Sequence, residues 1–449
     1  MQRVRRQDML RLVSERLDGR RLVWFGVRGE DVEGVADLAE LSASYSVIAP
    51  HPRLPSVALE QLSGTRADLD LHHIDENPDP VVGKLRRMML RELSDRTALF
   101  NYCPSAFVSA LGFARRDRCR YLGLFSDHQA AFDHKPWVET EVAALGVPHV
   151  QWSYVSDEEK LDTLRLLRRG PVMLRSSRAS GGVGLTRIDE PEQLAAAWPQ
   201  QDEAYVSVSR YIPDAAPINV GAVIWRDGIT MHPASFQLVG IQSLTPRRFG
   251  YCGNDFGAVR DLNPGQVDRI EHAVHRIGQW MRAHGYRGAF GADFLVPAGG
   301  EPLFTEVNPR FQGSTHASCQ LSISEGESCI LLDHLAALLG VDAPSSRTLG
   351  DLAASAGDFG SFVVHSPIAA PAHFDPSRLV DLFDAKPGVR RTDAVTSPEL
   401  VTDPCATVAR FTVDDRLTDT GYDLRREWDA AVREALPTML ESAVAAEPS

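Results

Sequence analysis

The segment 304–312 constrains this chain more than any other, because it sets polar side chains at fixed positions on an apolar strand. In an extended strand, residues i and i+2 point to the same face, so Glu306, Asn308 and Arg310 should lie in one row. A second apolar strand, 291–296, carries Asp293. Carboxylate and amide oxygens suit a magnesium ion that substrate phosphates also hold, and an arginine nearby suits charge on a transferred phosphoryl group. The two strands therefore predict nucleotide chemistry.

The size and charge of the chain indicate a globular protein and argue against some classes of partner. A chain of 449 residues, 43% of them hydrophobic and 24% charged, is long enough for about two to four domains. Its net charge of −13 argues against a nucleic-acid-binding protein, which normally carries a basic patch. No apolar run approaches the roughly 18–20 residues that cross a bilayer, and residues 1–7 lack the apolar core of a signal peptide. We therefore expect a cytoplasmic protein with no nucleic-acid or membrane partner.

Cysteine and lysine usage narrows the chemistry further. The six cysteines form no CxxC pair, which favours buried, reduced thiols over a zinc site or a disulfide framework. Only four lysines occur, so few residues are candidates for a phosphate-binding lysine. One of them, Lys135, begins a predicted helix about forty residues before Arg175. A lone lysine is more often a solvated surface charge.

The order of predicted elements indicates an α/β fold. Strands over 21–27, 45–50, 98–102 and 121–125 alternate with helices over 31–41 and 80–96, which predicts a parallel sheet. The loop 26–30 follows the first strand but is not GxGxxG, so dinucleotide binding is not favoured there. Further strands are predicted over 172–175, 204–208, 220–225, 361–365 and 406–411, and further helices over 135–145, 264–284, 328–340 and 423–443. A linker is predicted at 344–346.

A glycine-rich loop follows the strand that ends at Arg175. Its residues Ser180, Gly181, Gly182 and Gly184 would let backbone N–H groups approach phosphate oxygens. The loop is not the GxxxxGK[ST] motif, and a flexible hairpin is the alternative. The apolar segment 208–213 then ends at a proline, which is consistent with a hinge between two lobes.

Together these segments resemble the ATP-grasp superfamily from about residue 127 to 321, and the two acidic strands are especially similar to biotin carboxylase and carboxylate–amine ligases. The resemblance implies four regions: an α/β domain with a parallel sheet (1–126), the ATP-grasp small lobe and hinge (127–212), the large lobe with the metal site (213–343) and a C-terminal α/β region (344–449). It is compatible with a homodimer.

The resemblance also implies roles for individual residues. Asp293, Glu306 and Asn308 would bind magnesium, or manganese in its place, and Arg310 would stabilise the transition state. The implied ATP-binding residues are Lys135, Arg175, Ser180, Gly181, Gly182, Gly184, Arg210 and Ile212. Two positions depart from the family pattern: Arg175 stands where most members have a lysine, and Ser209 stands where relatives often have a hinge glutamate. Arginine keeps the charge and can bind phosphate through two bonds.

The reaction that the resemblance implies is ATP-dependent activation of a carboxylate as an acyl phosphate, followed by capture by an amine to give an amide or peptide. The loop 313–316 and the overall layout look similar to pheganomycin-type peptide ligases, which suggests small-molecule or peptide substrates of bacterial specialised metabolism. Arg247 and Arg248 are candidates to anchor a substrate carboxylate, with a solvated turn as the alternative. His316 is a candidate substrate contact or base, but a histidine that orders the loop is the favoured alternative. A carboxylase acting through carboxyphosphate, or a non-catalytic nucleotide-binding protein, are the other readings.

Overall fold

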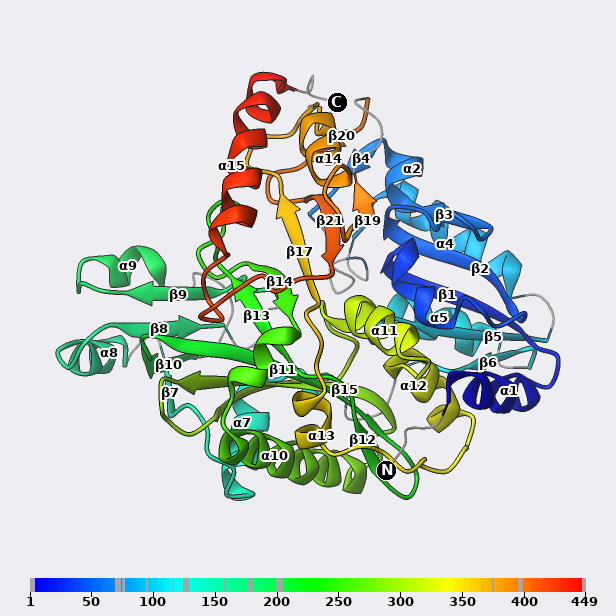
Figure 1. Ribbon diagram of the computed structural model, residues 1–449, viewed down its shortest axis with the longest axis horizontal. Helices are drawn as coiled ribbons and strands as arrows, with labels where there is room; N and C mark the ends of the chain where they lie inside the picture. Colours follow the sequence, from blue (N-terminus) through cyan, green and yellow to red (C-terminus); the bar gives the residue numbers. More distant parts are fainter. Residues whose placement is uncertain are drawn as a thin grey trace.

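Four β-sheets organise the chain in this computed structural model (Figure 1). The structure describes residues 5–68, 74, 77–93, 96–115, 117–123, 129–156, 159–176, 181–198, 205–373, 375–394 and 399–445. Ser180, one of the predicted phosphate-loop residues, lies outside them. No helix among the described residues is long and apolar enough to cross a membrane.

A parallel sheet comes first, in the strand order β3-β2-β1-β5-β6. Strands β1 and β5 are buried along most of their length, as expected when helices cover both faces of a parallel sheet. Helix α1 covers one face, and helices α4 and α5 cover the other. The elements are α1 (Arg6–Leu17), β1 (Arg21–Arg28), β2 (Leu41–Ile48), β3 (Ser56–Ala58), α2 (Leu59–Ser63), α4 (Pro80–Glu92), β5 (Thr97–Asn101), α5 (Ala106–Ala114) and β6 (Cys119–Tyr121). The prediction of a parallel sheet is confirmed.

The helix predicted over 31–41 is wrong. The segment instead forms a short 3-10 helix, η1 (Gly29–Val35), and strand β2 already begins at Leu41. The backbone turns tightly at Gly29, whose N–H donates to the carbonyl of Ala49 at 2.7 Å, and a Cβ there would collide with the backbone of His51. This close return leaves too few residues for a full α-helix before β2.

The small lobe is an antiparallel sheet in the order β7-β10-β8-β9. Val172, Leu174, Val206 and Val208 form its core with residues of the two helices that cover it. The elements are α6 (Gln129–Phe132), α7 (Lys135–Ala144), β7 (Trp152–Val155), α8 (Lys160–Leu167), β8 (Val172–Arg175), β9 (Leu185–Ile188), α9 (Gln193–Ala197) and β10 (Val206–Arg210). The predicted hinge, 208–213, connects this lobe to the next sheet.

The largest sheet has nine strands, eight of them in the order β16-β15-β11-β13-β14-β17-β21-β19, with β12 paired to β11. Its pairs are antiparallel. The elements are β11 (Ala215–Ile224), β12 (Ile229–Met231), β13 (Ser235–Val239), β14 (Tyr251–Asp255), η2 (Gly257–Asp261), α10 (Pro264–Ala283), β15 (Gly288–Pro297), β16 (Leu303–Asn308), α11 (Thr315–Ser324), α12 (Ile330–Leu338), α13 (Leu349–Ala354), β17 (Gly360–His365), α14 (Ser377–Asp384), β19 (Val389–Ala394), β21 (Thr407–Val413) and α15 (Arg426–Glu441). Helix α10 begins with a capping box, in which Asn263 and Gln266 satisfy each other's backbone N–H groups.

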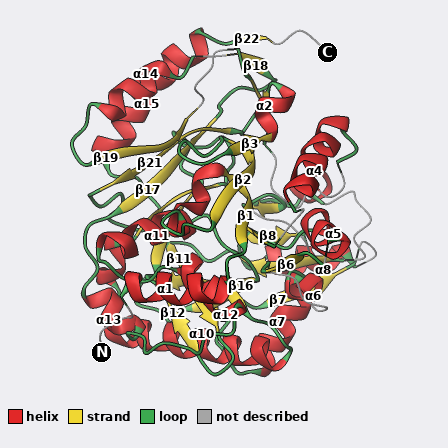
Figure 2. Ribbon diagram, turned by 90° about the vertical axis from the view of Figure 1, so that its right-hand side faces the viewer, coloured by secondary structure: helices red, strands yellow, loops and turns green. Residues whose placement is uncertain are grey.

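This sheet runs across the predicted start of the C-terminal region. The predicted linker lies in the coil between α12 and α13, yet β17 pairs with β14 and carries the sheet on to β21 and β19. Helices α14 and α15 lie side by side against these last strands (Figure 2). The division into four regions stays a prediction, while the sheet itself joins the last two.

A small fourth sheet ties the beginning of the chain to its end. Its order is β22-β18-β20-β4, and β4 is the one strand from the N-terminal part. The elements are β4 (Thr65–Arg66), β18 (Ala372–His373), β20 (Val401–Thr402) and β22 (Val444–Ala445).

Candidate active site

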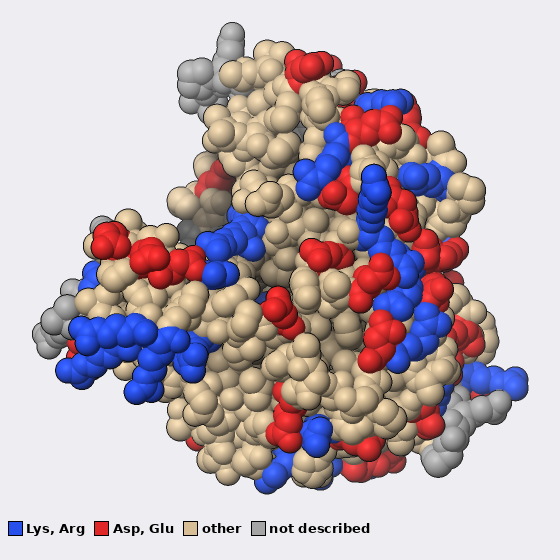
Figure 3. All heavy atoms as spheres, turned by 60° about the vertical axis from the view of Figure 1, so that its left-hand side comes forward, with Lys and Arg blue, Asp and Glu red and all other residues tan. Residues whose placement is uncertain are grey.

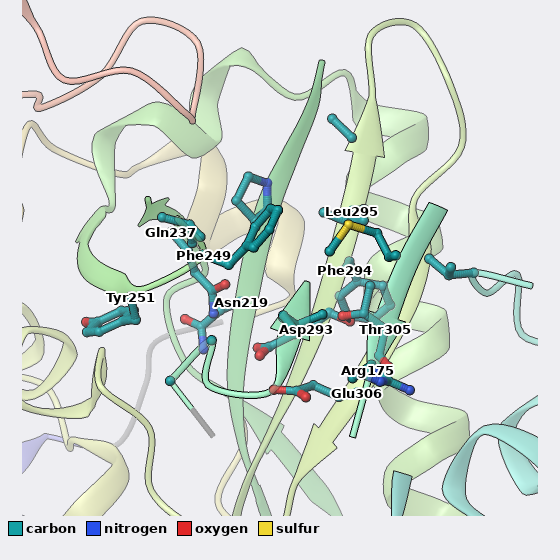
Figure 4. Close-up of a pocket in the computed structure, with 18 of the residues that line it drawn as sticks. Arg175, Asn219, Gln237, Phe249, Tyr251, Asp293, Phe294, Leu295, Thr305 and Glu306 are labelled. Carbon is teal, nitrogen blue, oxygen red and sulfur yellow. Dashed lines mark hydrogen bonds between the residues drawn. The ribbon is translucent and has the colours of Figure 1, made fainter. Parts of the chain in front are cut away.

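The two acidic strands, β15 and β16, pair directly and bring their polar side chains together. Asp293 lies opposite Glu306, and Gly291 lies opposite Asn308. The register shifts after Asp293, because Phe294 pairs with Phe304 and leaves Thr305 as one extra residue on β16. Such a bulge bends a strand locally and re-aims its side chains. Figure 4 shows the side chains of Asp293 and Glu306 beside each other in the cavity.

Asp293 accepts hydrogen bonds at both carboxylate oxygens. Nδ2 of Asn308 donates to Oδ2 at 3.0 Å, and Nε2 of Gln312 donates to Oδ1 at 2.9 Å. Burial, followed by the negative charge of Glu306, raises the pKa of Asp293 to about 7. A cation bound beside Asp293 would therefore favour the charged form of its carboxyl group.

Glu306 responds in the opposite way. Burial alone would raise its pKa, but the positive charges of Lys135, Arg175 and Arg310 outweigh burial and lower the pKa of Glu306. The nearest of these is Lys135, whose Nζ lies 3.2 Å from Oε2 of Glu306. The structure thus brings the lysine of α7, a residue far away in the sequence, to the acid of β16.

Three contacts fix the side chain of Arg175 at the end of β8. It forms an ion pair with Glu139, donates to the carbonyl of Thr305 at 3.2 Å and stacks 4.0 Å from the ring centre of Trp152. Burial lowers the pKa of Arg175 to about 10, and the charge of Glu306 opposes this shift. At pH 7 it remains a cation at the wall of the cavity.

These residues line one cavity of about 630 Å³ between the small lobe and the large sheet. Lys135, Arg175, Asp293, Glu306, Asn308 and Arg310 all contribute to its wall. In Figure 3, Lys and Arg side chains lie beside the hollow next to the protruding lobe, whose upper edge also carries Asp and Glu side chains. Within the cavity, the cations Lys135, Arg175 and Arg310 suit an anionic ligand.

One end of the cavity is lined by apolar side chains and by the hinge. Its wall there includes Val150, Met173 and Leu295, together with the predicted Arg210 and Ile212. Ser209 is 2% exposed and also lines the cavity, and its hydroxyl donates to the carbonyl of Arg210 at 3.3 Å. Apolar side chains beside the hinge suit a flat heteroaromatic ring.

The glycine-rich loop reaches across to the large lobe. Gly181 and Gly182 line the cavity, whereas Gly184 does not; its carbonyl accepts from the N–H of Ser176 at 3.1 Å. Gly182 has φ +81°, and a Cβ there would collide with the carbonyl of Phe249. Glycine is therefore required at this position, both for its left-handed backbone and for the close approach.

The predicted substrate residues are not all at the cavity. Arg248 lines it and lies 3.7 Å from Asp189 of the small lobe. Arg247 does not line it, and instead faces Asp68, with Nη1 donating to Oδ1 at 3.3 Å. His316 is buried in the first turn of α11 and is not part of the cavity wall. Burial, followed by the charges of Arg410 and Arg28, lowers the pKa of His316 well below its usual value, so it is placed poorly for a base.

Several polar residues of the site were not among the predicted ones. Gln237 lines the cavity, and Asn219 donates to Oε1 of Gln312 at 2.5 Å; Figure 4 shows Asn219 and Gln237 on the side of Asp293 away from Arg175. Tyr102 and Tyr251 also line the cavity. Asn219 gave one signal in the sequence, since it is an isolated amide within the apolar strand β11.

Comparison with curated proteins gives partial matches, and no protein-family model matches the chain. Formate-dependent phosphoribosylglycinamide formyltransferase of Synechococcus elongatus is 25% identical over 212 residues, which are 46% of this chain and 50% of that enzyme. The multifunctional protein CAD of Squalus acanthias is 26% identical over 177 residues, which are 38% of this chain and 8% of that protein. The chain thus spans about half the length of the formyltransferase.

Solved structures match over nearly the whole chain. The biotin carboxylase domain of Hydrogenobacter thermophilus 2-oxoglutarate carboxylase, a dimer with MgADP, ADP and bicarbonate, has a TM-score of 0.62 at 14% identity and covers 95% of this chain and 90% of its own. N5-carboxyaminoimidazole ribonucleotide synthetase with ADP has a TM-score of 0.61 at 10% identity, and the match covers 94% of this chain and 98% of that one. At these identities the likeness is one of fold.

Proposed function

The chain has the ATP-grasp fold, and from this fold we propose that it is an ATP-dependent ligase that activates a carboxylate and joins it to an amine, releasing ADP and phosphate. The observation that carries the proposal is the facing pair Asp293 and Glu306, set among Lys135, Arg175 and Arg310 in one cavity. Holding two anionic substrates together requires this combination of metal-binding oxygens and fixed cations.

The residues present fit a divalent metal ion. The two buried carboxylates repel each other, which contributes to the raised pKa of Asp293, and a cation between them would remove that repulsion. The two carboxylates have no third acid, histidine or cysteine beside them, since no such group of three or more is found among the described residues. Asp293, Glu306 and Asn308 would therefore need phosphate oxygens of the substrate to complete the ligands of a magnesium or manganese ion. The ion supplies charge neutralisation to the phosphates and orients them.

The other residues of the cavity would bind different parts of the substrates. Lys135 and Arg175 would bind the phosphates from the side of the small lobe, and Gly181 and Gly182 would close over them and exclude water. Arg310 would bind the oxygens of the acyl phosphate, since its Nε is buried without a hydrogen-bond partner among the described residues. Arg210 and Ile212 would meet the base through their backbone groups.

The reaction then needs no side-chain nucleophile. A carboxylate oxygen of the substrate forms a bond to the γ-phosphorus as the bond from that phosphorus to the bridging oxygen breaks, and ADP leaves. The amine nitrogen next forms a bond to the acyl carbon, the bond from that carbon to the phosphate oxygen breaks, and the phosphate leaves with the electron pair and the amine proton. An amide results.

The proposal names an amine as the group that receives the activated acyl group. It is supported by the partial sequence match to a formyltransferase that acts on phosphoribosylglycinamide, and by the resemblance of the loop 313–316 to peptide ligases, which also suggests bacterial specialised metabolism. The fold neighbours solved with ATP, ADP or MgADP support the nucleotide and the metal.

The test is a screen for ADP release with purified protein, ATP and magnesium, across amino acids and short peptides offered as acid and as amine. We expect ADP and phosphate only when a matching pair is supplied. Release of AMP and pyrophosphate would refute activation through an acyl phosphate.

A second candidate is a carboxylase that forms carboxyphosphate from bicarbonate. The fold likeness to a biotin carboxylase solved with bicarbonate favours it. It predicts ADP release that depends on bicarbonate and needs no other acid, so the same assay separates the two functions.

A further inference from the structure

A line of hydrogen bonds leads from the metal-binding carboxylate to another part of the cavity wall. It links six side chains: Asp293, Gln312, Asn219, Ser235, Asn254 and Tyr251. The first four bonds measure 2.9, 2.5, 3.0 and 2.9 Å, and the hydroxyl of Tyr251 bonds Asn254 to complete the line. We refer to these six residues as the Tyr251–Asp293 chain.

The direction of every bond in the chain is fixed from its carboxylate end. When Asp293 is ionised, as it would be with a metal ion bound, it accepts at both oxygens, so Gln312 presents its amide nitrogen there and its carbonyl oxygen to Asn219. An amide that donates from nitrogen accepts at oxygen, so Asn219 must accept from the hydroxyl of Ser235. The same argument makes Asn254 donate to Ser235 and accept from Tyr251.

Tyr251 is therefore restricted to one kind of bond with a bound molecule. Its single O–H is committed to Asn254, and burial raises the pKa of Tyr251, so that the proton stays in place. Toward any molecule in the cavity, the phenolic oxygen can only accept. Bonds that all point one way also polarise one another, which makes that oxygen a better acceptor.

Tyr251 lines the same cavity as the metal-binding carboxylates and lies on the far side of Asn219 from Asp293 (Figure 4). Its ring lies against Gly313, where a Cβ would come within 2.6 Å of it. Gly313 directly follows Gln312 and also lines the cavity. The Tyr251–Asp293 chain thus connects the metal-binding acid to the acceptor oxygen across strands β15, β11, β13 and β14, through the loop residue Gln312.

We propose that Tyr251 binds the amine substrate by accepting a hydrogen bond from its N–H group. This inference rests on the proposed ligase function and extends it, since it assigns the side of the cavity that holds the nucleophile. The phenolic oxygen of Tyr251 offers an acceptor to an amine or ammonium N–H group, whereas a carboxylate or bicarbonate oxygen would face its lone pairs.

The test uses Tyr251→Phe with the amino acid that gives the most ADP release in the screen above. The variant should raise the KM for that amine about tenfold, the expected cost of one hydrogen bond lost in a closed site, and leave the KM for ATP unchanged. With hydroxylamine as a small substitute nucleophile at saturating concentration, it should release ADP at the wild-type rate. Tyr422→Phe is the matched control. Tyr422 also lines the cavity, but it is 39% exposed and is not one of the six residues of the Tyr251–Asp293 chain.

The outcomes separate the two proposals. If the wild type needs an amine but Tyr251→Phe keeps its amine KM, the assignment of Tyr251 is wrong and the ligase function stands. If the wild type releases ADP with bicarbonate alone, the ligase function itself is wrong. If circular dichroism shows that Tyr251→Phe does not fold, inhibition of the wild-type protein tests the role of Tyr251 instead. The N,N,N-trimethyl derivative of the amine has no N–H group, so it should inhibit at least about tenfold more weakly than the N,N-dimethyl derivative. Equal inhibition would overturn the proposal.

Discussion

Burial acts on both Asp293 and Glu306, yet the pKa of the first is raised to about 7 and the pKa of the second is lowered. The difference lies in their partners, because Glu306 faces Lys135 and two arginines while Asp293 faces neutral amides. The site therefore contains one acid that is already compensated and one that still needs a cation. This asymmetry leads to two predictions at the scale of single residues.

Metal affinity should depend on pH through Asp293. Below about pH 7 a proton competes with the metal ion for its carboxylate, so the affinity for Mn²⁺ should fall by up to about tenfold for each pH unit. Without metal, the raised pKa of Asp293 changes the stability of the folded state instead. The folded state holds a proton that the unfolded state releases, so this residue contributes stability below its unfolded pKa that is lost as pH rises through about 7. Electron paramagnetic resonance of Mn²⁺ between pH 6 and 8 measures the affinity, and Asp293→Asn should abolish its pH dependence.

Glu306→Gln should reduce substrate-dependent ADP release at least about a thousandfold, since it removes the charge that would hold the metal. The fold should persist, because glutamine has the same shape and can still contact Lys135. The matched control is Glu301→Gln, a change in a turn where the side chain is 60% exposed. Thermal melting and the ADP assay together check this; an active Glu306→Gln variant would contradict the metal assignment.

The row of Glu306 and Asn308 could be predicted from the sequence because the alternation of a strand is a local property. The place of Asp293 opposite Glu306 could not be fixed, because it depends on the register of two strands and on the extra residue Thr305. The bond from Gln312 to Asp293 could not be predicted either, since it depends on a loop that folds back over Gly291. Long-range pairing decides these positions.

At the scale of elements, the glycine-rich loop closes against the segment that follows β13, and not against solvent alone. Gly182 approaches the carbonyl of Phe249, while Gly181 has no atom within 4 Å of the position where its Cβ would be. The composition of the loop indicated its flexibility, but which glycine is required follows only from the other lobe.

Gly182→Ala should lower kcat/KM for ATP at least about tenfold, because the added methyl group collides with Phe249 and a positive φ disfavours alanine. Gly181→Ala is the matched control, since it shares the positive φ but has open space, and it should cost less than about threefold. Steady-state kinetics with varied ATP checks the pair. Equal losses in the two variants would show that the backbone conformation matters and the contact does not.

At the scale of the whole molecule, buried ion pairs join the first sheet to the last strands. Arg66 of β4 bonds Glu60 at 2.7 Å and Asp393 of β19 at 3.2 Å. Asp393 also lies 3.3 Å from Arg28 of β1, and Arg410 of β21 pairs with Asp31 at 2.9 Å. The side chains of Arg66 and Asp393 are 2% and 1% exposed. The sequence predicted the N-terminal and C-terminal regions separately, and no pattern in it indicated the contacts between them, which span more than 300 residues.

Arg66→Ala should destabilise the protein by about 3–5 kcal/mol, because it removes the cation that the buried carboxylates of Glu60 and Asp393 share. The exposed pair of Arg390 and Asp414 serves as the control, since both side chains are about half exposed, and Arg390→Ala should cost less than about 1 kcal/mol. Urea unfolding followed by tryptophan fluorescence measures both values. Similar values for the two variants would mean that the buried network contributes little to the stability of the folded state.

The pairing of Arg66 with Asp393 also sets an order of events during synthesis. The two residues are 327 positions apart, and at about 5–20 residues per second a ribosome needs roughly 16–65 s to add the residues between them. Throughout that interval Arg66 lacks Asp393, its partner on β19. The hydrogen bond between them can form only when the chain is nearly finished, so the environment of Arg66, in the first part to emerge, is among the last to be completed.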